Sequence, residues 1–220
     1  MGTRGAFGVI IGEEEKIAYN HFDSYPDGKG IEVLGWLRSV VDEGRLDEIK
    51  KLAHKVRVVD ENSKPTARDK QKLRSFTNLN VADQSEDDWY CLTREMQGDL
   101  GLTLGSGYML DRSNFPLDSL FCEWAYIVDL DAEVFEVYAG FQKTLPKQGR
   151  WKGRPTLAED TENYIAHLEW CHENDRKPFR KRRAEYKAIE MIASWPLDEL
   201  PGDDHFLSAL GRQEEEAAIA

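Results

Sequence analysis

The stretch from Leu120 to Phe141, LFCEWAYIVDLDAEVFEVYAGF, constrains the fold more than any other part of the chain. Its first arm alternates between two faces, its second arm is rich in Val, Phe and Tyr, and 129–132 forms the turn between them. One face of the first arm carries Phe121, Glu123, Ala125 and Ile127, and the other carries Cys122, Trp124, Tyr126 and Val128. A period of two with β-favouring residues is typical of strands. The stretch therefore predicts a long antiparallel hairpin.

A second strand pair is predicted at the N-terminus. The apolar run GAFGVII at 5–11 ends at a glycine and three glutamates, and β-favouring residues resume at 16–21. A short strand is expected at 56–59 and a further strand at 186–195, because both segments contain β-branched or aromatic residues.

Helices are predicted between the hairpins. Apolar residues recur at three- and four-residue spacing over 30–43 and 46–54, with Gly44 as the stop between them. Two hydroxyl–carboxylate pairs have the spacing of a capping box, and the second one opens an expected helix over 86–97. These pairs are Thr66 with Asp69 and Ser85 with Asp88.

The same capping pattern occurs at Thr156 and Glu159 and predicts a helix over 157–173, and a short final helix is expected near 203–211. The Gly-rich segment 101–110, GLTLGSGYML, lacks the Lys-Ser/Thr ending of a phosphate-binding loop and is interpreted as a structural loop.

These elements predict an α+β fold, in which an antiparallel sheet is built from the two hairpins and the C-terminal strand, with helices mainly on one side. A chain of 220 residues with 40% hydrophobic content can bury one sizeable core. We therefore expect a single domain over 1–211, followed by a flexible acidic tail over 212–220.

Composition favours an acidic cytoplasmic protein. Its 41 acidic and 29 basic residues leave a net charge of −12, which disfavours general attraction to nucleic acid or anionic lipid. No stretch approaches the ~18 consecutive apolar residues that a membrane-spanning helix needs. The three cysteines are widely spaced, which is typical of reduced thiols rather than a disulfide framework. No membrane association is expected.

The polar and aromatic stretch 19–26, YNHFDSYP, is the best candidate for a functional surface. Antiparallel arms meet at their open ends, so residues near 20–25 are expected beside the N-terminus. A carboxylate on the aromatic strand at 123 is costly to bury alone, which makes an N-terminal arginine its natural partner. The six residues predicted to converge are Arg4, Asn20, His21, Asp23, Tyr25 and Glu123.

Two interpretations of this group stay open. In the functional one, His21, Asp23 and Glu123 are catalytic, and Arg4, Asn20 and Tyr25 bind a ligand. His21 and Asp23 would share one side of a regular strand, so the carboxylate could orient the imidazole as a general acid or base. In the structural one, the stretch is a corner in which Asp23 accepts backbone amide hydrogens.

Two other segments bear chemistry-capable residues. The stretch HLEWCH at 167–172 contains three potential zinc ligands without a partner cluster, so a packed thiol and surface histidines are expected and no metal is assigned. The run 176–183 holds six basic residues in eight, of which Arg180, Lys181, Arg182 and Arg183 form a secondary candidate for nucleic-acid contact. A solvated loop is the preferred interpretation.

Three motifs together resemble a family of small proteins from bacteriophages and from bacteria, particularly actinobacteria. They are the opening MGTRG, the stretch YNHFDSYP followed by DGKG, and the later LFCEWAYIVDLD. The resemblance covers most of the chain outside about 142–185, and Ser24 replaces a glycine common in the family. No activity is established for that family, so the resemblance implies a phage or prophage origin and a role in the infected cell.

Two functions therefore follow as expectations. The first is a phage-type accessory protein whose polar pocket binds, or binds and hydrolyses, a small or nucleotide-related ligand. The second is a host-takeover or anti-defence protein that occupies a bacterial protein partner through its acidic surface. No cofactor is assigned in either case.

Overall fold

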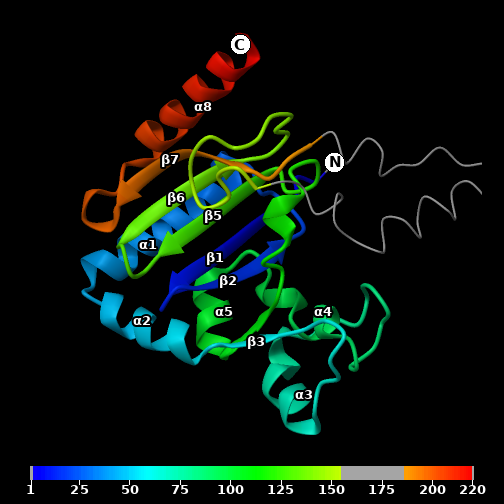
Figure 1. Ribbon diagram of the computed structural model, residues 1–220. Helices are drawn as coiled ribbons and strands as arrows, with labels where there is room; N and C mark the ends of the chain where they lie inside the picture. The colour runs from blue at the N-terminus through cyan, green and yellow to red at the C-terminus, as the bar shows by residue number, and fades with distance from the viewer. Residues whose placement is uncertain (1, 155–185, 220) are drawn as a thin grey trace, which may run out of the picture.

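The computed structural model describes residues 2–154 and 186–219, and the side chains of these residues up to 211. A five-stranded sheet forms its centre (Figure 1). Across the sheet the order is β2 (Glu14–Asn20), β1 (Gly5–Ile11), β5 (Trp124–Asp129), β6 (Val134–Ala139) and β7 (Glu190–Pro196). The α+β class and both hairpins, β1 with β2 and β5 with β6, are confirmed.

The sheet is mixed rather than wholly antiparallel. Strand β1 pairs parallel to β5, while the other neighbours in this sheet are antiparallel. The hairpin patterns predict partners within each pair but carry no information on how two pairs join. After β2, a long connection brings the chain back to the end of the sheet where β1 begins. Strand β5 therefore starts beside the start of β1 and runs parallel to it.

Strand β1 is buried along its whole length, because it has a strand on each side and packing on both faces. Phe7, Val9 and Ile11 belong to the larger core beneath the helices, whereas Ala6 and Ile10 belong to the core on the opposite face. This explains why its sequence is an uninterrupted apolar run rather than an alternating one.

Helices cover one face of the sheet. Helix α1 (Ile31–Asp42) lies behind the strands in Figure 1, α2 (Leu46–Lys55) follows it, and α8 (Asp203–Ile219) projects beyond the sheet. Gly44 has a positive φ of 65°, as expected for a residue that stops a helix. The final helix is longer than predicted: residues 212–219, expected to form a tail, continue α8.

The other face is covered by irregular segments. Trp151, Ala188 and Ile189 are fully buried against Tyr138 and the strands on this side. Beside them the Arg150 guanidinium bonds the Glu136 carboxylate at 2.8 Å and also contacts Asp129, and the three side chains are largely shielded from solvent. Buried carboxylates need such pairing, so this arginine joins the loop to β5 and β6.

A small lobe packs beside β2 and is visible below the sheet in Figure 1. It contains a two-stranded parallel sheet of β3 (Arg57–Val59) and β4 (Tyr108–Leu110), with α3 (Ala67–Leu73) and α4 (Trp89–Leu92). Asp69 closes the predicted capping box at the start of α3 and accepts a 2.7 Å hydrogen bond from the Tyr108 hydroxyl. The lobe has its own core, built around Trp89 and Leu73.

Two predictions within the lobe are wrong. The helix expected over 86–97 is only α4 followed by the 3-10 turn η3 (Arg94–Met96), because Asp88, not Ser85, caps the helix by accepting from the Tyr90 amide. The expected loop at 101–110 is instead α5 (Leu100–Ser106) followed by β4. Asp99 caps α5, and a left-handed Gly107 ends it.

No helix within the described ranges is long and apolar enough to cross a membrane. The predicted helix over 157–173 lies outside the described residues.

Replacing Gly8 by alanine is expected to destabilise the protein by about 1–3 kcal/mol, because an added Cβ would lie 2.3 Å from the Lys16 carbonyl oxygen of β2. Chemical denaturation at neutral pH measures the change. Gly35 of α1 is the matched control: no atom lies within 4 Å of its added Cβ, so Gly35→Ala should stabilise by ~0.5–1 kcal/mol. Equal effects of the two substitutions would contradict this packing of β1 against β2.

Candidate functional site

The stretch that follows β2 is a fixed corner. Strand β2 ends at Asn20, which is 5% exposed and donates from its side-chain amide to the Ser24 hydroxyl at 2.8 Å. The Tyr126 hydroxyl of β5 donates to the Ser24 carbonyl at 2.9 Å, and the Ser24 amide donates to the Thr3 carbonyl. The turn is therefore tied to the central strands on two sides. The structural network runs through Asn20 and Ser24 rather than through the Asp23 carboxylate.

His21 and Asp23 do not form the predicted pair. The strand ends before both residues, and Asp23 has a positive φ of 53°, so the regular alternation that would place the two side chains together is lost. The His21 Nδ1 atom instead shares a 2.8 Å hydrogen bond with the Tyr19 hydroxyl. Tyr19, not Asp23, orients the imidazole.

Arg4 and Glu123 are in contact, but the hydrogen bonds involve the Arg4 backbone and not its guanidinium. The Glu123 amide donates to the Arg4 carbonyl at 3.0 Å, and the Arg4 amide donates to the Glu123 carboxylate at 3.3 Å. The Arg4 guanidinium lies over the Phe121 ring, 5.3 Å from its centroid, rather than on the carboxylate. The predicted proximity is confirmed, whereas the predicted ion pair is wrong, because the cation stacks on an aromatic ring.

Tyr25 faces a different part of the surface. Its carbonyl accepts from the Gly28 and Gly30 amides and closes the turn η1 (Pro26–Gly30). Its side chain, 48% exposed, lines a hollow of about 280 Å³ together with Trp124 and Leu207 of α8. The segments that carry the six predicted residues thus lie next to one another, but their side chains are divided among different surfaces.

A polar hollow of about 300 Å³ gathers two of the predicted residues, Asn20 and Asp23, between the corner and the lobe. We call it the Arg94 hollow. Its lining combines two cations, two carboxylates, three amides and two apolar side chains: Lys29 and Arg94, Asp23 and Glu95, Asn20, Asn78 and Gln97, and Phe22 and Val81. Charges of both signs in one hollow are suited to a ligand that carries an anionic end and hydrogen-bond donors.

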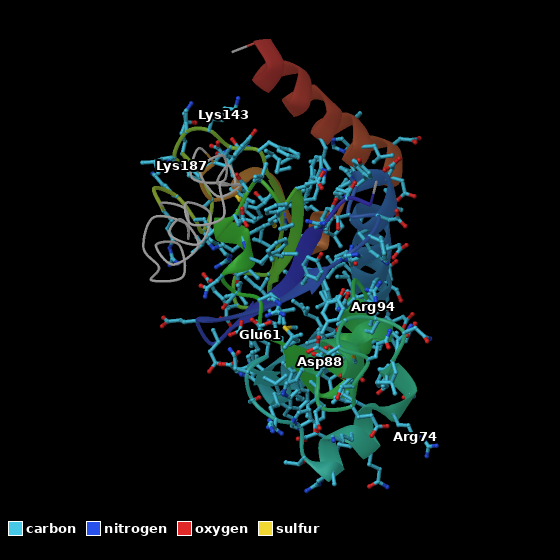
Figure 2. The ribbon with its side chains drawn as sticks, turned by 90° about the vertical axis from the view of Figure 1, so that its right-hand side faces the viewer. Glu61, Arg74, Asp88, Arg94, Lys143 and Lys187 are labelled. Atoms are coloured by element: carbon cyan, nitrogen blue, oxygen red, sulfur yellow. The ribbon has the colours of Figure 1, made fainter. Side chains whose placement is uncertain are left out.

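Arg94 is the cation of this hollow that packs against aromatic rings. Its guanidinium lies 5.1 Å from the centroid of the Phe22 ring and 5.8 Å from that of Tyr90, and it donates to the Gln97 side chain at 2.5 Å. It makes no salt bridge with any carboxylate of residues 2–154 and 186–211. Figure 2 shows Arg94 on the lobe nearer the sheet, and Arg74 towards the outer end of the same lobe.

The close approach of the lobe to the corner depends on a glycine. Gly98 follows η3 with a φ of 80°, and a Cβ there would lie 2.6 Å from the Asn20 side-chain oxygen and 2.6 Å from the Lys29 Cε atom. Only a residue without a side chain allows the lobe to approach the corner this closely. The approach brings Arg94 to the residues that follow β2.

Burial lowers the pKa of His21, and the positive charges of Arg94 and Arg4 lower this pKa further. The imidazole is therefore neutral at neutral pH. It can accept or donate a hydrogen bond there without adding charge. Burial also raises the pKa of Tyr19, which keeps its hydroxyl protonated as the partner of His21.

Sequence reasoning missed Arg94, Lys29, Asn78 and Gln97. The short motif singled out only its own residues, whereas these side chains come from η1 and from the lobe, and their convergence depends on how the lobe docks on β2. No sequence pattern marks these side chains, and only the structure shows that Phe22 of the motif is 48% exposed and lies against Arg94.

The secondary candidates lie outside the described residues. These are the basic residues Arg180, Lys181, Arg182 and Arg183, and the possible ligands at 167–172. Within the ranges that the structure describes, no group of three or more His, Cys, Asp or Glu side chains could hold a metal ion. Cys91 and Cys122 are buried free thiols.

Comparisons with protein-family models, with curated proteins and with solved structures gave no match.

Replacing Arg94 by glutamine is expected to raise the pKa of His21, because one of the two arginine charges that lower it is removed. An NMR titration of the His21 ring resonances measures this shift. Arg74→Gln removes the same charge from an exposed position on the lobe and should leave the titration unchanged. An unaltered or lower His21 pKa in the Arg94 variant would show that the two groups are not close.

Proposed function

We propose that this chain is a phage-type accessory protein that binds a small polar ligand in the Arg94 hollow. The observation that carries the proposal is Arg94 itself, an arginine that lies against two aromatic rings and lines a hollow of about 300 Å³. An arginine fixed in this way loses little further conformational entropy when it binds, so its remaining N–H groups are pre-organised for an acceptor.

The surroundings of Arg94 support ligand binding over a purely structural role. In a chain of charge −12, a structural arginine has many carboxylates available, and Arg150 takes two of them. Arg94 takes none among the described residues, and the nearby Glu95 carboxylate accepts instead from the Asn78 amide at 2.6 Å. A site that keeps its cation uncompensated is suited to receive an anion from outside.

The geometry favours binding over hydrolysis. A general base needs its orienting partner and the reacting group within hydrogen-bond reach. His21 is held by a tyrosine rather than by Asp23, and the Glu123 carboxylate accepts from the Arg4 amide at the start of the strands. We assign Asn20 and Asp23 to ligand contact, and the phage origin rests on the motif resemblance described above.

A thermal-shift screen of small metabolites, phosphates, sugars and amino acids tests the proposal. A ligand that binds the native state at 100 times its Kd should stabilise the protein by about 2.7 kcal/mol, and therefore raise its Tm. The variant Val81→Trp fills the hollow from its rim and should abolish the shift while folding normally. A screen in which no compound raises the Tm, or in which Val81→Trp keeps every shift, would refute the proposal.

A second candidate function, binding of a bacterial protein partner, is favoured by a different surface. Asp42, at the end of α1, and Asp47 and Glu48, in the first turn of α2, are exposed and form no ion pair with any described residue. Clustered exposed carboxylates attract a basic partner and speed its association.

The partner hypothesis predicts an association rate that falls with salt. The triple variant Asp42→Asn, Asp47→Asn, Glu48→Gln should slow association by about tenfold or more at low salt, as measured by surface plasmon resonance with a partner isolated from bacterial lysate. Val81→Trp serves as the control and should bind that partner normally. A partner lost with Val81→Trp and kept by the triple variant would assign the interaction to the Arg94 hollow instead.

A further inference from the structure

The Arg94 hollow contains groups that are already satisfied and groups that are not. Lys29 pairs with Glu32, and the Asn78 amide donates to Glu95. The Asn20 amide donates within the corner. These side chains shape the hollow more than they select a ligand.

Two charged groups remain available. Arg94 uses one N–H on Gln97, which leaves several donors of its guanidinium. The Asp23 side chain is exposed and makes no hydrogen bond or ion pair with the part of the chain that the structure describes, although its carbonyl accepts from the Lys29 amide at 2.9 Å. A guanidinium prefers a planar or tetrahedral oxyanion, and a free carboxylate prefers hydroxyl or amine donors.

The remaining donors of Arg94 favour an oxyanion with several acceptors. Two carboxylates, Asp23 and Glu95, also line the hollow, but neither forms an ion pair with Arg94, and Glu95 accepts from the Asn78 amide. A phosphate monoester presents three acceptor oxygens to the guanidinium.

The remaining lining indicates what accompanies the phosphate. Phe22 is nearly half exposed although its ring also contacts the Arg94 guanidinium and the His21 ring, and Val81 is partly exposed. The hollow therefore offers the remaining aromatic surface and an aliphatic side chain to an apolar or ring-shaped group. Carboxylates bind ribose hydroxyls in nucleotide sites, and aromatic side chains stack on bases of any identity. The volume of about 300 Å³ lies at the small end of ligand sites, which span roughly 300–1,000 Å³, and so suits one nucleotide rather than two.

We propose that the ligand of the Arg94 hollow is a nucleoside monophosphate, with its phosphate on Arg94, its ribose hydroxyls on Asp23 and its base against Phe22 and Val81. This inference rests on the proposed function and specifies its ligand class. Since the Asn20 and Asn78 amides donate within the protein and the Gln97 side-chain oxygen accepts from Arg94, the base is held mainly by its ring surface rather than by its polar edges. Discrimination among the four bases is therefore weak.

Isothermal titration calorimetry with AMP, GMP, CMP and UMP tests this assignment on the full chain. All four should bind, with affinities within about tenfold of one another. Arg94→Gln should weaken AMP binding by about 10- to 100-fold, which corresponds to the loss of a charge-assisted hydrogen bond of about 1.5–3 kcal/mol. Arg94→Lys should retain part of the affinity. The matched control Arg74→Gln should bind as the parent does.

Asp23→Asn separates the two ends of the ligand. It should weaken AMP but leave the weaker binding of inorganic phosphate unchanged, whereas Asp83→Asn, another exposed aspartate, should alter neither. An independent readout is the His21 titration by NMR: bound AMP should raise the pKa of His21 by adding negative charge beside Arg94, and adenosine should raise it much less.

The outcomes distinguish this inference from the proposed function. If AMP fails to bind while another compound raises the Tm in a manner that Val81→Trp abolishes, the hollow binds a ligand and the nucleotide assignment is wrong. If inorganic phosphate binds as tightly as AMP, or if Arg94→Gln leaves AMP binding intact, the assignment is also wrong. If no compound binds at all, both proposals fail.

Discussion

The burial of β1 between β2 and β5 is the constraint on which the rest of the structure depends. Gly5, at the start of β1, lies opposite Asn20, at the end of β2, and opposite Trp124, at the start of β5. Antiparallel pairing on one side and parallel pairing on the other therefore place three strand ends side by side: the start of β1, the end of β2 and the start of β5. Because β1 is buried on both faces, its register cannot shift without exposing one of two cores.

The corner after β2 is fixed at the place where these three strand ends meet. The Tyr126 hydroxyl holds the Ser24 carbonyl, and the Asn20 amide holds the Ser24 hydroxyl, so the turn is anchored from β5 and from its own strand. A corner anchored in this way presents Phe22 and Asp23 outward, where they can contact the lobe and solvent. The polar motif is thus both a structural corner and one wall of a hollow, and the two interpretations of the sequence are not exclusive.

The lobe supplies the charge that the corner lacks. Arg94 is placed by η3, whose Met96 is anchored in the core of the lobe, and Gly98 lets this segment contact the corner closely. The result is an arginine that has no carboxylate partner among the described residues, in a protein of net charge −12. Long-range attraction by the acidic surface and local attraction by Arg94 select different partners, which is why separate substitutions distinguish them.

The spacing of apolar residues was sufficient to predict the secondary structure of several segments. The alternation in 120–141 and the apolar run at 5–11 predicted both hairpins, and the spacing of apolar residues predicted α1 and α2. The uninterrupted apolar character of 5–11 also contained the evidence that β1 is central, since a strand with one solvent face alternates. The prediction of one helix over 86–97 was wrong, because the Asp88 cap starts the helix later than expected and the 3-10 turn η3 replaces its last turn.

The sequence by itself therefore determined the strands of the central sheet, helices α1 and α2, the beginning of α8, the α+β class and the contact between the segments of Arg4 and Glu123. It could do so because hydrogen-bonding period and hydrophobic spacing act over a few residues. Only the tertiary structure decided the parallel β1–β5 pairing, the separation of His21 from Asp23, and the arrival of Arg94 beside the corner. The first and third are contacts between segments far apart in the chain, and the second follows from a single backbone torsion at Asp23. None of the three leaves a periodic trace in the sequence. The two contacts are set by the docking of surfaces that form only after the local elements have folded, and a single torsion does not repeat along the chain.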